Sequence, residues 1–160
     1  KITQIQGSFG FGKGPATLEL GGVPAFRPLI CYEIIFPQYA AASPRPAWIV
    51  NVTDDAWFGT WHGPYQHLAQ TRFRAVEQGL PVARAANTGI SAIIDPYGRI
   101  VSQLGINAVG VVDGGLPRAI EPPFYARFGP WVLVGLCVVA ACVALWAHFW
   151  RRNRRYRGAA

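Results

Sequence analysis

Short apolar runs alternate with polar turns along residues 14–116, and one long amphipathic stretch interrupts them. The runs are rich in β-branched residues and are bounded by Gly, Pro or Asp, which predicts β-strands. These predicted strands span residues 17–20, 28–31, 47–52, 82–86, 90–94, 99–104 and 109–113. Between the third and the fourth, residues 62–80 repeat apolar side chains at helical spacing. The order of elements predicts an α/β (α+β) fold, a mixed sheet with helices on one face.

The predicted helix at 62–80 has Pro64 in its first turn and Gly79 and Pro81 at its end, as helix boundaries prefer. Its apolar positions are expected to face the sheet: Leu68, Ala69, Phe73, Val76 and Leu80. Three charged positions are expected to form a solvated face: Arg72, Arg74 and Glu77. After the helix, the sequence Asp-Pro-Tyr-Gly at 95–98 separates two predicted strands. This is the residue order of a type I turn, so we expect a hairpin there.

Residues 131–150 contain no Asp, Glu, Lys or Arg. As a helix they would span roughly 30 Å, the thickness of the hydrocarbon core of a bilayer. Trp131 lies at one end and Trp146 and Trp150 at the other, where indole rings favour the membrane interface. A buried core helix is the alternative, but such helices seldom stay uncharged over this length. The pattern predicts one C-terminal transmembrane helix.

Composition supports this organisation. The 160-residue chain is 51% hydrophobic and only 14% charged, with a net charge of +7. Five arginines lie in the tail at 151–160, which leaves a net charge of +2 for residues 1–150. The positive charge therefore does not form a nucleic-acid-binding face, and nucleic acid is not expected as a partner. A basic flank indicates the cytoplasmic side of a membrane. We expect a domain at 1–124 on the opposite side, a linker and membrane helix at 125–150, and a cytoplasmic tail at 151–160.

Cys31 is the one cysteine outside the predicted membrane helix, which contains Cys137 and Cys142. It ends an apolar run and is followed two residues later by Glu33. A lone thiol is either a small buried residue or a nucleophile kept for its thiolate. Active sites of α/β folds gather at strand ends, and the backbone N–H after a sharply turned nucleophile can stabilise an oxyanion. Position alone leaves both readings open.

Other polar and aromatic residues have two interpretations each. The loop with Trp57, Phe58 and Trp61 is either a lip that contacts acyl chains or ordinary loop packing. Asp54 and Asp55 follow a buried strand and either act in the site or, as carboxylates at strand ends more often do, serve as turn or cap residues. His62 and His67 are five residues apart and therefore lie on different helix faces, so we do not expect a zinc site.

Four segments together resemble one family. They are PLICYEIIFP at 28–37, NVTDDAWFG at 51–59, RFRAVEQGLPVARAANTGISAIIDPYGRI at 72–100 and YAR-x-GPW at 125–131. In this combination they closely resemble the C-terminal half of the apolipoprotein N-acyltransferases, which belong to the nitrilase (carbon–nitrogen hydrolase) superfamily. The first and third segments alone indicate the superfamily. The second, with the C-terminal span and basic tail, indicates the acyltransferases.

The resemblance implies a partial nitrilase-like αββα sandwich on the periplasmic side of a bacterial inner membrane, with the C-terminus in the cytoplasm. It implies that Cys31 is a nucleophile that takes an acyl chain from a phospholipid as a thioester. The acceptor would be the N-terminal diacylglyceryl-cysteine amine of a lipoprotein. Tyr32 and Glu33 match supporting residues. Candidate substrate-binding residues are Trp57, Phe58, Trp61 and Asn87. No metal and no cofactor are expected.

The sequence departs from the family pattern before Cys31. The family uses a Glu–Lys–Cys triad, with the lysine in a Tyr-Lys-Leu-Pro-Phe context. Neither Lys1 nor Lys13 has that context, and Glu19 lies in the wrong segment. We therefore expect a C-terminal part of a longer chain that is inactive alone. A membrane-anchored amidase with the same cysteine and a non-catalytic periplasmic binding domain are the alternatives.

Overall fold

The computed structural model describes the backbone of residues 14–157 and the side chains of residues 14–150. The chain separates into two compact units, Lys1–Pro123 and Phe124–Ala160. The sequence-based domain boundaries at 124 and 150 stay a prediction. Lys1 and Lys13 lie outside the described residues, and so do the side chains of the basic tail.

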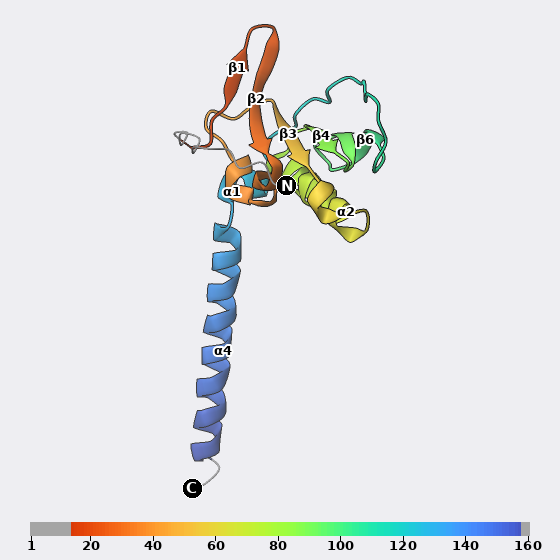
Figure 1. The fold of residues 1–160 in the computed structure, drawn as a ribbon. Coiled ribbons are helices and arrows are strands. Elements are labelled where there is room, and N and C mark those ends of the chain that lie inside the picture. The colour runs from red at the N-terminus through yellow and green to blue at the C-terminus, as the bar shows by residue number, and fades with distance from the viewer. Residues whose placement is uncertain (1–13, 158–160) are drawn as a thin grey trace, which may run out of the picture. The chain divides into compact units, whose positions relative to one another are not determined.

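A six-stranded mixed sheet forms the centre of the first unit (Figure 1). Its strands are β1 (Leu18–Leu20), β2 (Val23–Ile30), β3 (Trp48–Asp54), β4 (Val82–Asn87), β5 (Ser91–Ile94) and β6 (Ile100–Leu104). Neighbours in the sheet follow the order of the sequence. The two pairings β2–β3 and β3–β4 are parallel, and the outer pairings are antiparallel. The C-terminal ends of the three parallel strands therefore meet at one edge of the sheet.

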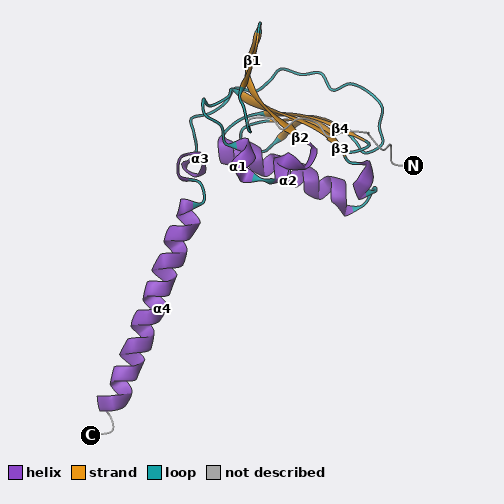
Figure 2. Cartoon of the chain, turned by 60° about the vertical axis from the view of Figure 1, so that its left-hand side comes forward, coloured by secondary structure: helices purple, strands orange, loops and turns teal. Residues whose placement is uncertain are grey.

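Helices cover one face of this sheet (Figure 2). The chain leaves β2 into a 3-10 helix, η1 (Cys31–Ile35), and the short helix α1 (Pro37–Ala40). After β3 it forms a second 3-10 turn, η2 (Ala56–Phe58), and the long helix α2 (His62–Gln78). Gly79 ends α2 in the left-handed conformation, with φ of 63°, which glycine adopts at little steric cost. Together these elements confirm the predicted α/β fold class.

The face of the sheet under the helices is buried. In β3 the side chains of Ile49, Asn51 and Thr53 are buried, whereas Val52, on the other face, is half exposed. This is the period-two alternation of a strand with one covered face. The apolar core gathers on the covered side and contains Leu29, Ile34, Ala40, Ile49, Leu68, Ala75, Leu80, Val82, Ile90, Ala92 and Ile94.

Six of the seven predicted strands are present, although β2 begins earlier than predicted. The seventh prediction, a strand at 109–113, is wrong. Val109 and Val111 are exposed there, and the chain pairs with no strand among the described residues. The predicted hairpin between β5 and β6 is confirmed. The carboxylate of Asp95 accepts hydrogen bonds from the backbone N–H groups of Tyr97 and Arg99, at 2.9 and 2.8 Å.

Helix α2 is present where the pattern predicted it, but the buried face is different. Phe73 and Val76 are exposed, whereas Arg74, which we expected in solvent, is only 4% exposed. Arg74 pairs with Glu77 at 2.9 Å and donates to the carbonyl of Ile35 at 3.4 Å. The buried side of α2 therefore carries several polar side chains, whose partners come from neighbouring elements and from the helix itself.

The second unit contains α3 (Phe124–Phe128) and α4 (Trp131–Arg157). Residues Trp131–Trp150 of α4 form a helix long and apolar enough to cross a membrane, and none of that apolar window is buried in protein. The helical backbone continues past the apolar stretch into the basic tail.

Candidate active site

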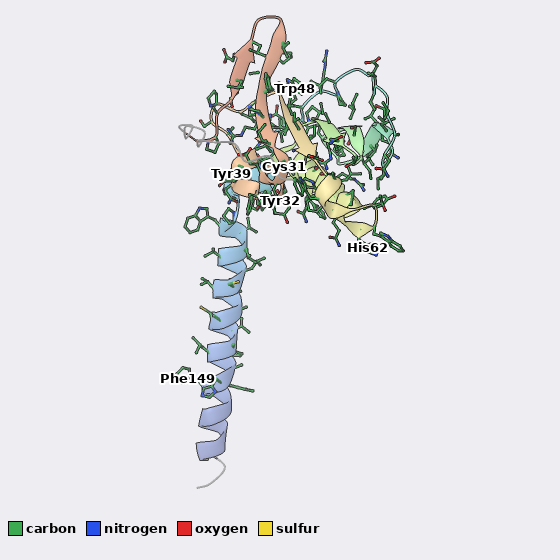
Figure 3. All side chains as sticks on the ribbon, in the orientation of Figure 1. Cys31, Tyr32, Tyr39, Trp48, His62 and Phe149 are labelled. Atoms are coloured by element: carbon green, nitrogen blue, oxygen red, sulfur yellow. The ribbon has the colours of Figure 1, made fainter. Side chains whose placement is uncertain are left out.

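Cys31 lies where β2 leaves the sheet and η1 begins, and Figure 3 shows it beside Tyr32 at that end of the strand. Its backbone has φ of 49°, in the left-handed region that residues other than glycine seldom adopt. The side chain is half buried. A non-glycine residue held in a strained conformation at a strand end is typical of a functional turn. We call residues 30–33, which contain the predicted nucleophile, the nucleophile turn.

Glu33 stabilises this turn from within. Its Oε2 accepts a hydrogen bond from the backbone N–H of Ile30 at 2.7 Å, across the strained residue. A carboxylate that caps the first N–H groups of a helical turn is favourable because those groups have no partner inside the helix. This contact gives Glu33 a supporting place next to Cys31.

A buried polar network lies under the nucleophile turn, between α2 and the sheet. Arg84 of β4 pairs with Asp55, with Nη2 and Oδ2 2.6 Å apart and both side chains fully buried. Oδ1 of Asp55 accepts from Thr53 at 3.1 Å and lies 2.8 Å from Nδ1 of His67. Nη1 of Arg84 donates to Thr71 at 3.2 Å and to Oδ1 of Asn51. We call these side chains the Asp55–Arg84 network.

Asn51 connects the network to the nucleophile turn. Its Nδ2 donates to the carbonyl of Leu29 at 3.0 Å and approaches the carbonyl of Cys31 at 3.5 Å. Because β2 and β3 are parallel neighbours, with Leu29 opposite Asn51, the side chain lies beside the point where β2 ends. The network therefore reaches the backbone on both sides of Ile30.

Burial determines the charge states in the network. It lowers the pKa of His67, an effect that the hydrogen bond to Asp55 opposes and the positive charge of Arg84 reinforces. His67 is therefore neutral at pH 7, and its Nδ1 lies between Oδ1 of Asp55 at 2.8 Å and Nη2 of Arg84 at 3.2 Å. A hydrogen bond to the backbone of Cys31 also opposes the effect of burial on the pKa of His67. Burial also lowers the pKa of Arg84, and Asp55 opposes this effect.

Two aromatic side chains lie near the ring of His67. The ring of Tyr32 lies 5.9 Å from the His67 ring and 6.2 Å from the ring of Phe58, which itself lies 5.5 Å from His67. These three side chains line a cavity of about 280 Å³ together with Ile35, Gly63, Gln66 and Gln70. Tyr32 and Phe58, two of the predicted site residues, are thus brought together next to the nucleophile turn.

The other predicted substrate-binding residues lie on the surface. The side chains of Trp57 and Trp61 are 76% and 78% exposed, on the loop that precedes α2. Asn87 ends β4 opposite Asp54 in the register and donates to Oδ1 of Asp54 at 3.2 Å. Asp54 also accepts from the backbone N–H of Ala56, so it acts as a turn residue. The substrate-binding roles of these residues stay predictions.

Sequence reasoning missed the importance of Asp55, His67, Arg84 and Asn51. Asp55 was expected to be a turn or cap residue, and it is a fully buried partner of an arginine. One signal was available. Arg84 is a charged residue inside a short strand of small apolar residues, and a charge in such a strand must have a buried partner.

The carbon–nitrogen hydrolase family model matches residues 6–120 of the chain. Among curated proteins, the apolipoprotein N-acyltransferase of Rhodopseudomonas palustris is 55% identical over 81% of this chain, and that of Bradyrhizobium diazoefficiens is 52% identical over 88%. The corresponding protein of Brucella melitensis is 46% identical over 95%. The chain covers 24%, 27% and 29% of these proteins, so it spans about a quarter of their length.

The fold is also similar to a solved structure. An amidase from Nesterenkonia sp. AN1, in which acrylamide has added to the active-site cysteine, superposes with a TM-score of 0.52. It is 22% identical, and the match covers 77% of this chain and 48% of the amidase. This likeness extends to the fold alone. Since the family model matches well over half of the residues, the chain belongs to the carbon–nitrogen hydrolase family.

Proposed function

We propose that this chain is part of an apolipoprotein N-acyltransferase and that Cys31 is its nucleophile. The names of the three relatives above, which are 46–55% identical, support the activity. The single structural observation that carries the proposal is the conformation of Cys31, a half-buried thiol in the left-handed region between a parallel strand and a 3-10 helix. The proposed acyl donor is a phospholipid, and the proposed acceptor is the free amine of a lipoprotein's N-terminal diacylglyceryl-cysteine.

In the first step the Cys31 thiolate attacks the ester carbonyl of the phospholipid. A bond forms between Sγ and the acyl carbon, the ester C–O bond breaks, and the lysophospholipid oxygen leaves with the proton that the general base took from the thiol. In the second step the acceptor amine attacks the thioester. The new amide bond forms, the S–acyl bond breaks, and a carboxylate base takes the amine proton. A thiolate suits both steps because it is a good nucleophile and a good leaving group.

Glu33 and Tyr32 are supporting residues in this proposal. Glu33 holds the turn through its contact with the N–H of Ile30, so its carboxylate is already engaged. Glu19 is a poor candidate for the general base. It lies exposed in β1, which pairs with the beginning of β2, whereas Cys31 follows the end of β2. The base and the lysine that the resemblance requires are therefore expected from other parts of the full-length protein.

The acyl chains would contact the exposed indoles of Trp57 and Trp61. Large exposed aromatic side chains on one loop are uncommon in a soluble domain and suit an apolar ligand. We propose that α4 anchors the protein in a bacterial inner membrane, with the catalytic domain in the periplasm and the arginines of the tail in the cytoplasm.

The proposal is tested with full-length protein in detergent and a phospholipid that carries a labelled acyl chain. We expect a labelled thioester that hydroxylamine releases, and transfer of the label to a diacylglyceryl lipopeptide. Cys31→Ser should abolish the thioester, whereas Cys137→Ser, the matched control, should retain it. Label that appears as free fatty acid and not on the lipopeptide would favour an amidase-like hydrolase. Unchanged labelling of Cys31→Ser would contradict the proposed nucleophile.

Orientation has a separate test. A full-length Ala160→Cys variant, in a Cys31→Ser, Cys137→Ser, Cys142→Ser background, should resist a membrane-impermeant maleimide in intact spheroplasts and react once the membrane is opened. Labelling in intact spheroplasts would place the tail outside the cytoplasm and contradict the proposed orientation.

A further inference from the structure

We propose that Asn51 is a positioning residue for Cys31, and that Arg84 and Asp55 hold its amide in the orientation this requires. The inference rests on the proposed nucleophilic role of Cys31. It adds that one amide group holds the nucleophile turn in its strained conformation. This amide contacts the backbone and does not touch the substrate.

Asn51 is placed where one side chain can reach both ends of the strand-to-helix junction. It is fully buried in the middle of β3, directly opposite Leu29 in the parallel register. The amide nitrogen lies 3.0 Å from the carbonyl of Leu29 and 3.5 Å from the carbonyl of Cys31. These two acceptors bracket Ile30, the last residue of β2. The amide therefore spans the junction at which the chain enters the left-handed conformation of Cys31.

The orientation of this amide is determined by its other end. Oδ1 of Asn51 accepts from Nη1 of Arg84, and a guanidinium has no acceptor atom. The amide cannot be reversed, because a reversed amide would place N–H against N–H at Arg84 and oxygen against two carbonyls. Arg84 is in turn paired with Asp55 at 2.6 Å in a fully buried site. A buried chain of contacts thus runs from the carboxylate of Asp55 to the backbone of Cys31.

Burial makes this arrangement rigid. Asn51, Asp55 and Arg84 are each at most 4% exposed, so water cannot replace a lost partner at little cost. Two supports hold the turn from opposite sides. Glu33 binds the N–H of Ile30 from within the turn, and Asn51 binds the carbonyls on either side of Ile30 from the neighbouring strand.

A purely structural role for Asn51 would affect stability but not the reactivity of the thiol. Asn51→Asp separates the two roles. It keeps an oxygen that accepts from Arg84 and nearly the same shape, and it removes the N–H groups that contact Leu29 and Cys31. Asn51→Ser is a second, uncharged variant whose side chain is too short to reach the carbonyls of both Leu29 and Cys31. Val82→Ala is the matched control, because Val82 is fully buried at the other end of β4 and contacts neither Asn51 nor Cys31 in any hydrogen bond.

The experiment measures alkylation of Cys31 by iodoacetamide in full-length protein, in a Cys137→Ser, Cys142→Ser background. Rates are followed to the alkaline plateau, where the thiol is fully ionised, so that a changed thiolate fraction does not affect the comparison. The melting temperature of each variant is measured in the same detergent. We expect the plateau rate to fall about tenfold or more in both Asn51 variants, because small displacements of a nucleophile are costly. Val82→Ala should lose melting temperature and keep the plateau rate.

Two outcomes would overturn the proposal. The first is an Asn51 variant that is folded and whose plateau rate of alkylation equals the wild-type rate. The other is an equal fall in Val82→Ala, which would assign the effect to general loss of stability. Alkylation does not require acyl transfer. If wild-type protein forms no thioester from phospholipid but the Asn51 variants still lose thiol reactivity, the proposed function fails and the positioning role stands.

Discussion

Nη2 of Arg84 lies 2.6 Å from Oδ2 of Asp55, with both side chains completely removed from solvent. The pair joins β4 to the residue that follows β3, and through Asn51 it reaches the backbone next to Cys31. Two charged side chains are stable at this buried position only because they pair with each other and their remaining polar atoms are hydrogen bonded. Four predictions follow from this site and its surroundings.

Removing one charge of the pair should destabilise the protein strongly. Arg84→Leu leaves the carboxylate of Asp55 buried without its cation, and we expect a loss of about 3–5 kcal/mol in the free energy of unfolding. Denaturant unfolding in detergent measures it. Arg99→Leu removes an exposed arginine of the hairpin and should change stability by less than about 0.5 kcal/mol. The double variant Arg84→Leu, Asp55→Asn should lose less than the sum of the single variants. An additive result would contradict the coupling.

His67 should make the protein less stable at mildly acidic pH. Its pKa in the folded protein is lowered from its ordinary value of 6.5, chiefly by burial. The unfolded chain therefore binds this proton more readily. The stability that neutral His67 contributes is complete above about pH 6.5 and is lost as the pH falls from there toward the folded pKa.

Melting temperatures between pH 8 and pH 5 provide the measurement. Glu77 acts in the opposite direction, because burial raises its pKa from the ordinary 4.5, so the wild-type curve must be compared with variants. His67→Asn should remove part of the acid loss, since an amide does not titrate. His62→Asn, at an exposed position of the same helix, should follow the wild-type curve. Parallel curves for the wild type and His67→Asn would contradict the prediction.

Gly89→Ala should disturb the Asp55–Arg84 network without changing any of its residues. A Cβ atom at Gly89 would overlap the carboxylate of Asp55, whose Cβ and Cγ would each lie 2.7 Å away. Overpacking of this kind costs about 1–3 kcal/mol, and here it would also displace the partner of Arg84. Unfolding experiments and the iodoacetamide assay both apply. Gly105→Ala is the matched control, because a Cβ atom there meets no atom within 4 Å. Equal stability of the two variants would show that the turn containing Gly89 adjusts without cost and would contradict the prediction.

Trp57→Ala and Trp61→Ala should affect the use of the lipid donor and leave stability nearly unchanged. Both side chains are largely exposed, so truncation removes little buried apolar area. If they contact acyl chains, the apparent KM for the phospholipid should rise several-fold, with a smaller change in kcat. Tyr97→Ala removes an exposed aromatic ring from the β5–β6 turn and is the control. A KM equal to that of the control would argue against the acyl-contact role.

Local pattern was sufficient for most of the sheet and for the position of α2. Short apolar runs bounded by Gly, Pro or Asp identified six strands, because such runs need only a covered face and a turn. The predicted strand at 109–113 is wrong because its valines match the pattern but pair with no strand among the residues that the structure describes. The buried face of α2 also could not be predicted. An apolar side chain such as Phe73 normally faces the core, whereas here polar partners next to the helix bind buried polar side chains instead. Asp55 contacts His67, and the carbonyl of Ile35 accepts from Arg74.

The sequence by itself determined the fold class and the apolar C-terminal helix, because local patterns of apolar and polar residues predict both, and its resemblance to a known family supplied the candidate nucleophile. Only the tertiary structure decided what holds Cys31. Asn51, Asp55, His67 and Arg84 come from β3, the turn after it, α2 and β4. They meet because parallel strands end at one edge of the sheet and α2 lies across it. A buried charge is stable only where such distant partners converge, and that convergence is a property of the assembled fold.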